Sequence, residues 1–76
     1  MRWIAAKAVV FDSITDEESH VDIVVDMHII GHFYEELPDR TSITNAMGDV
    51  IFTLVMPFEK FRALYFRHLG IVMGRN

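Results

Sequence analysis

Apolar and polar residues alternate with a period of two in the middle of the chain. Between His20 and Tyr34 the odd positions are apolar apart from Gly31, and the even positions mix His and Asp with apolar residues. This pattern is typical of a strand that buries one of its faces. The sequence therefore predicts one long strand over residues 20–34, in which Gly31 is the natural place for a bulge or bend.

The segments on either side of this strand also favour β structure. Residues 2–11 contain β-branched and aromatic side chains and no helix cap, which predicts a first strand. Residues 12–19 consist mainly of turn formers and acids, so they predict a hairpin connection to the long strand. Residues 35–40 predict a turn, because Pro38 lacks an N–H donor and holds the preceding residue extended.

Two β-type runs within residues 41–56 are separated by the stretch Asn45–Asp49. They form either a tight hairpin between a short strand and a long one or a single strand with a bulge at Gly48. In both alternatives residues 50–56 form a strand.

The last part of the chain changes to a helical pattern. Pro57 suits the first position of a helix and Gly70 suits a left-handed cap at its end, which predicts a helix over residues 57–69. Residues 71–73 predict a short final strand. The apolar residues of the helix cover a wide arc and are Phe58, Phe61, Leu64, Tyr65, Phe66 and Leu69.

These elements predict an α+β fold formed by a single domain over residues 1–76, a length that suits one small core. We expect an antiparallel β-meander of three or four strands with the C-terminal helix packed on one face. The apolar odd positions of residues 21–33 should contact the helix through Phe58, Phe61, Tyr65 and Leu69.

The net charge of −4 hides a strong segregation along the chain. Residues before Asp12 carry +2, residues 12–39 carry −9 without one Lys or Arg, and residues from Arg40 onward carry +3. The acidic middle segment is explained either as solvated surface that keeps an apolar protein soluble or as a patch that binds a basic partner surface. The residues predicted to bind such a protein partner are Asp16, Glu17, Glu18, Glu35 and Glu36.

Composition excludes several kinds of catalytic site. The chain contains no cysteine, which rules out disulfides, thiolate nucleophiles and zinc–cysteine sites. Its glycines are isolated, so no phosphate-binding loop is formed, and its serines lack a nucleophile-elbow motif. We therefore expect no catalytic residues, no enzyme activity and no cofactor.

Three histidines are candidate metal ligands. His20, His28 and His32 share one face of the predicted long strand, where His28 and His32 would stand about 13 Å apart, too far to bind one ion. Asp26 and His28 form a two-ligand fragment for which the sequence marks no third ligand. We expect no metal site and regard these histidines as half-exposed sheet residues.

Nucleic-acid and membrane binding are also not expected. Lys60, Arg62 and Arg67 form the one basic stripe, which is small for a protein of pI near 5.4. No apolar run approaches the ~18 residues of a membrane span, so a cytoplasmic location is expected.

The sequence thus predicts a small, acidic, non-enzymatic interaction protein of the inhibitor or adaptor type. Its apolar content is high for one small core, which predicts a homo-oligomer, most simply a dimer, with Ile30, Leu64 and Phe66 in the interface. The alternative is an oligomer that sequesters a small anionic ligand, such as a nucleotide, between its subunits. Its anion-binding residues would be Arg62, Arg67 and His68.

Overall fold

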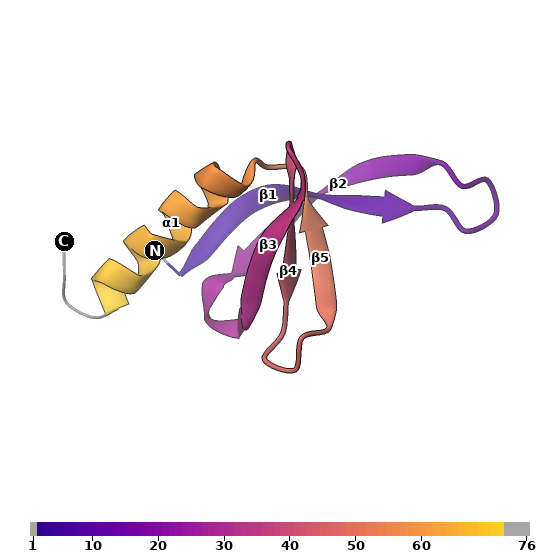
Figure 1. Ribbon diagram of the computed structural model, residues 1–76. Coiled ribbons are helices and arrows are strands. Elements are labelled where there is room, and N and C mark those ends of the chain that lie inside the picture. The colour runs from indigo at the N-terminus through magenta and orange to yellow at the C-terminus, as the bar shows by residue number, and fades with distance from the viewer. Residues whose placement is uncertain (1, 73–76) are drawn as a thin grey trace.

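The computed structural model describes residues 2–72 and shows a five-stranded sheet with one α-helix beside it (Figure 1). The elements in chain order are β1 (Trp3–Phe11), β2 (Glu18–Asp26), the 3-10 helix η1 (Met27–Ile29), β3 (His32–Leu37), β4 (Arg40–Thr44), β5 (Val50–Leu54) and α1 (Phe58–Val72). The strand order is β2-β1-β5-β4-β3 and all pairs are antiparallel. The predicted α+β class and antiparallel sheet are confirmed.

The predicted number of three or four strands is wrong, because the segment predicted as one strand over residues 20–34 forms two. The break is η1, where the Asp26 side chain accepts a hydrogen bond of 3.0 Å from the His28 N–H. Beyond this turn, Gly31 N–H donates to the carbonyl of Thr44 at 2.8 Å, which begins the pairing of β3 with β4. The two resulting strands lie at opposite edges of the sheet.

The other connections lie within the predicted turns, but the predicted turn over residues 35–40 is reduced to Pro38 and Asp39 between β3 and β4. Residues 12–17 join β1 and β2 as a hairpin, and Asn45–Asp49 join β4 and β5, so the hairpin alternative for residues 41–56 is the correct one. The sheet consists of a β1–β2 hairpin and a β3–β4–β5 meander. The two parts are joined by the pairing of β1 with β5, so the five strands do not form one continuous meander.

The core lies between α1 and the sheet face that carries Ala8 of β1 and Leu54 of β5. The Phe33 ring packs against three rings of the helix. Its centroid lies 5.6 Å from that of Phe58, 5.0 Å from that of Phe61 and 5.0 Å from that of Tyr65. The predicted contact between the odd face and the helix is therefore confirmed for Phe33. The buried apolar residues are Ile4, Ala8, Val25, Met27, Ile30, Ile43, Leu54, Met56 and Phe61. At Val21 and Ile29 the prediction is wrong, since both are exposed, whereas the odd positions Val25 and Met27 are buried in the core.

Helix α1 ends later than predicted. It continues through Gly70 to Val72, so Gly70 is not the cap and the final strand predicted for residues 71–73 is wrong at Ile71 and Val72; Met73 lies outside the described residues. A glycine inside a helix costs only about 1 kcal/mol relative to alanine, which is too little to end a helix by itself.

The molecule is elongated, with dimensions of 47 × 23 × 20 Å. In Figure 1 the far ends of β1 and β2 project from the sheet on one side, and α1 lies on the other side. We call residues 10–22, the projecting ends of β1 and β2 with their turn, the arm. Every residue of the arm is exposed.

Candidate protein-binding face

The turn of the arm is built by Asp12. Its carboxylate accepts hydrogen bonds from the N–H groups of Ile14 at 2.8 Å and Thr15 at 3.3 Å, and its backbone bonds both Glu17 and Asp16. Asp16 adopts a φ of 58°, a left-handed conformation that Asp tolerates better than most residues. The result places Ile14 at the tip of the arm with 92% of its surface exposed.

The sheet face turned away from α1, which we call the open face, carries alternate residues of each strand. Val9 and Phe11 lie on this face in β1, opposite His20 and Glu18 of β2. The register between β1 and β5 contains one pair, Ala8 with Leu54, so the rest of β1 diverges from β5 and continues paired with β2. This divergence leaves a concave region on the open face.

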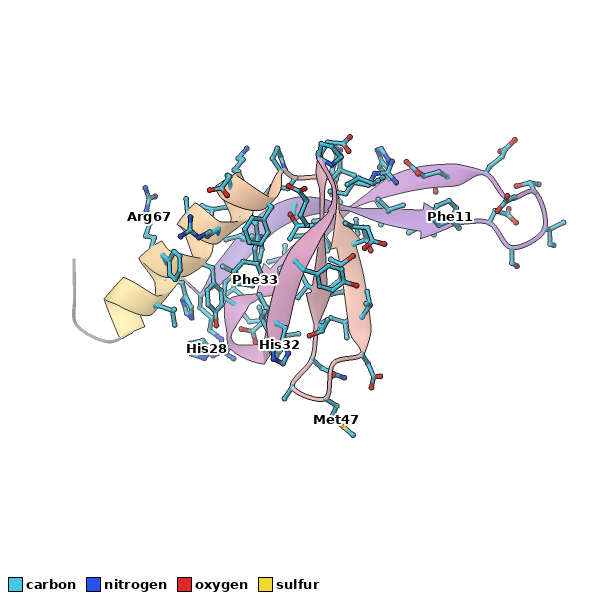
Figure 2. The ribbon with its side chains drawn as sticks, in the orientation of Figure 1. Phe11, His28, His32, Phe33, Met47 and Arg67 are labelled. Atoms are coloured by element: carbon cyan, nitrogen blue, oxygen red, sulfur yellow. The ribbon has the colours of Figure 1, made fainter. Side chains whose placement is uncertain are left out.

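A hollow of about 310 Å³ occupies that region. Its lining residues come from β1, β3, β4 and β5 and are Val9, Phe11, Glu36, Leu37, Arg40 and Thr53. Phe11 is 60% exposed at its rim and Leu37 is half exposed, so two large apolar side chains face solvent there. Figure 2 shows Phe11 near the base of the arm.

One ion pair connects the arm to the far wall of the hollow. Arg40 of β4 donates from both terminal nitrogens to the Glu18 carboxylate of β2, at 2.7 Å through Nη1. His20 Nε2 lies 2.7 Å from the same carboxylate. The hydrogen bonds from Arg40 and then His20 lower the pKa of Glu18 from its ordinary value. Nε of Arg40 is buried without a hydrogen-bond partner among the described residues, so the side-chain hydrogen bonds of this guanidinium go to Glu18.

A second depression, of about 530 Å³, lies between the β1–β2 pair and the start of α1. It is more open to solvent than the hollow, and Lys7 and Asp22 on its wall form an ion pair of 2.8 Å. Its β1 wall consists of Ala5, Ala6 and Lys7, with no aromatic side chain. The depression also contains Ile23, Val24, Val55 and Met56, but the hollow is more enclosed and has an exposed aromatic side chain, Phe11, at its rim.

The structure separates the five acidic residues predicted to bind a partner. Asp16 and Glu17 lie at the tip of the arm, Glu18 is paired with Arg40, and Glu36 lines the hollow. Glu35 and Glu36 belong to β3 rather than to the predicted turn. Glu35 lies opposite Thr41, on the face that carries Leu54, so it is not part of the open face.

The predicted oligomer interface is also divided. Ile30 is 9% exposed and packs in the core of the single chain, so little of its surface is left for contact with a second chain. Leu64 is half-buried against the same core. Phe66 is 53% exposed, and the Arg62 guanidinium stacks over its ring at 5.2 Å.

The predicted anion-binding residues do not converge within one chain. Successive helix positions are rotated by about 100°, so residues 62, 67 and 68 point in three directions. Arg62 lies 3.4 Å from Glu59, Arg67 is exposed, and His68 is only 4% exposed.

The burial of His68 was not predicted from the sequence. Its ring packs against the His28 ring, with the centroids 4.9 Å apart and the planes tilted by 53°, and its centroid lies 6.3 Å from that of the Tyr65 ring. His28, in η1, and His32, at the start of β3, are not on one continuous strand (Figure 2). Within residues 2–72, no three His, Asp or Glu side chains are placed to bind a metal ion together.

Comparisons with protein-family models, curated proteins and solved structures find no match to this chain. Among the described residues, no helix is long and apolar enough to cross a lipid bilayer. Function is therefore inferred from the chemistry of the open face and the arm.

Proposed function

We propose that this protein is a non-enzymatic interaction protein that binds a basic surface of a partner protein through the hollow on its open face. By occupying that surface it acts as an inhibitor or an adaptor. The observation that carries the proposal is the exposure of Phe11 and Leu37 at the rim of the hollow, on a sheet face that no other element of residues 2–72 covers.

The apolar lining supplies the affinity in this proposal. Fully burying a Phe or Leu side chain contributes about 1.5–3 kcal/mol, and aromatic residues are enriched at the centres of protein interfaces. Phe11 sits on a strand that is paired with β2, so little side-chain freedom beyond its own rotamers is lost on binding. An apolar side chain of the partner would enter between Phe11 and Leu37.

The charges around the hollow favour a basic partner. Glu36 lines it and Asp39 lies in the adjoining β3–β4 turn, whereas the charge of Arg40 is balanced by Glu18. The acidic tip of the arm extends this negative surface. A basic partner would be attracted to this side of the molecule and a nucleic acid repelled from it.

The proposal is tested by capturing partners from the native cell with tagged wild-type protein, the Leu37→Glu variant and a Met47→Glu control. Leu37 and Met47 are both exposed, but Met47 lies in the β4–β5 turn, away from the hollow (Figure 2). We expect one stoichiometric protein with wild type and with Met47→Glu, and its loss with Leu37→Glu. Equal capture by all three proteins contradicts a role for the hollow.

A further inference from the structure

The face of the sheet that contacts α1 extends beyond the helix. On this face β1 carries Ile4, Ala8 and Val10. Ile4 and Ala8 are buried, but Val10 and its neighbour Val21 of β2 are exposed, because α1 does not reach the arm. A two-stranded hairpin gains stability when a surface packs against one of its faces, so a cover over Val10 and Val21 would stabilise the arm.

The arm and the helix carry opposite charges. The arm holds five acidic residues and no Lys or Arg; of these, Asp12, Asp16 and Glu17 form no ion pair within residues 2–72. Helix α1 carries Lys60, Arg62 and Arg67 against the single acid Glu59. Figure 2 shows Arg67 and Phe11 toward opposite ends of the molecule.

The outer surface of α1 is also partly apolar. Phe66 is exposed there with Arg62 stacked on its ring, and Ala63 beside it is exposed as well. One helix surface thus offers an aromatic side chain and cations together. This surface is complementary to the arm, where the apolar residues Val10, Val21 and Ile14 are exposed among acidic residues.

We propose that a second copy of the chain covers the arm, in a twofold dimer in which the arm of each copy lies on helix α1 of the other. This inference goes beyond the proposed function: it takes up the homo-oligomer predicted from the sequence and names the surfaces that meet. A contact between two arms would oppose two sets of five carboxylates, and a contact between two helices would oppose two sets of cations. Only the arm-to-helix contact joins opposite charges.

The shape of the molecule allows two equivalent arm-to-helix contacts to form in one closed dimer. The arm and the helix lie at opposite ends of a molecule 47 Å long, so a twofold axis across its middle brings each arm to the partner's helix. Both contacts then form at once and leave no free end for further growth. The open face, which carries Phe11 on the other side of the arm, stays available for the partner protein.

The absence of cysteine makes a cross-linking test direct. Ser13→Cys places a thiol in the turn of the arm and Ala63→Cys places one on the outer surface of α1, both at exposed positions where the new side chain is of similar size. The double variant is treated with a short bifunctional maleimide and compared with each single variant. A Met47→Cys/Ala63→Cys double variant, with its first thiol in the β4–β5 turn, is the matched control.

We expect the Ser13→Cys/Ala63→Cys protein to give at least about tenfold more cross-linked dimer than either single variant or the control, because contact raises the local thiol concentration from micromolar toward millimolar. Phe66→Asp in the same protein should abolish the cross-link while the circular dichroism spectrum stays that of wild type. Rapid cross-linking of Ser13→Cys alone, or of Ala63→Cys alone, overturns the proposal in favour of arm-to-arm or helix-to-helix contact. A monomer at high micromolar concentration by sedimentation equilibrium also overturns it. Capture of the partner protein tests the hollow separately, so failure of the dimer and failure of the proposed function are distinguishable.

Discussion

Gly31 is the position at which the structure makes its sharpest prediction about stability. A Cβ atom added there would lie 2.2 Å from the carbonyl oxygen of Asn45 and 2.6 Å from Cα of Ala46. Both are backbone atoms, so no side-chain rotation relieves the contact. Gly31 is itself held in place, because its N–H donates to the Thr44 carbonyl at 2.8 Å.

The β4–β5 turn has little freedom to move away. The Asn45 N–H donates to the Asp49 carbonyl at 2.9 Å, and the Asn45 side chain accepts from the N–H groups of Met47 and Asp49. Overpacking in a tight site costs about 1–3 kcal/mol and sometimes more. Since a contact of 2.2 Å with fixed backbone is severe, we expect Gly31→Ala to destabilise the protein by about 3 kcal/mol or more.

Gly48→Ala is the matched control, since it makes the same chemical change in the neighbouring turn. Gly48 has a φ of 91° and nothing within 4 Å of an added Cβ, so its cost arises only from backbone conformation and should be about 1–2 kcal/mol. The assay is urea unfolding followed by circular dichroism. With an m-value of about 1 kcal/mol per M, Gly31→Ala lowers the midpoint by about 3 M or more and Gly48→Ala lowers it by only about 1–2 M. A Gly31→Ala protein as stable as wild type refutes the placement of Gly31 against Asn45.

Three further predictions concern the core and acid stability. Phe61→Ala removes a fully buried ring and should cost about 3–5 kcal/mol in the same urea assay, whereas Phe66→Ala should change monomer stability by less than about 1 kcal/mol. Ile30→Asp should unfold the protein, seen as loss of its circular dichroism spectrum, because it buries an unpaired charge; a folded monomer would contradict the burial of Ile30. The hydrogen bond from Arg2 holds the pKa of Asp26 at about 2, against 3.8 ordinarily, so its carboxylate stabilises the fold above about pH 4 and this contribution is lost as the pH falls toward 2. Asp26→Asn should therefore flatten the dependence of unfolding midpoint on pH over that interval, and an unchanged slope would contradict the pairing.

The sequence predicted the fold class because alternation and turn residues are local signals. The arm turn and the helix follow from them, whereas the β4–β5 hairpin was only one of two alternatives that they left open. The break in residues 20–34 did not, since the apolar alternation continues through Met27 and Ile29 while Asp26 caps a 3-10 turn. That cap depends on the Asp26 carboxylate accepting a hydrogen bond from the His28 N–H. A search for alternating apolar and polar positions does not detect such a bond.

The candidate site could be predicted only in part from the sequence. Segregation of charge predicted an acidic surface, but the hollow forms because β1 diverges from β5 and β3 contains a register shift between Glu35 and Leu37. Pairing between strands distant in sequence determines such features. The burial of His68 beside His28 has the same origin, because it depends on where η1 lies relative to α1.

The most direct test of the central claim is calorimetric titration of the captured partner into wild-type protein and into Phe11→Ala, with Met47→Ala as control. We expect one partner per chain and, for Phe11→Ala, a dissociation constant raised about thirtyfold or more, which corresponds to the ~2 kcal/mol of an interface hot spot. Met47→Ala should bind as wild type does. A Phe11→Ala protein that binds with unchanged affinity would contradict the assignment of the hollow as the binding site.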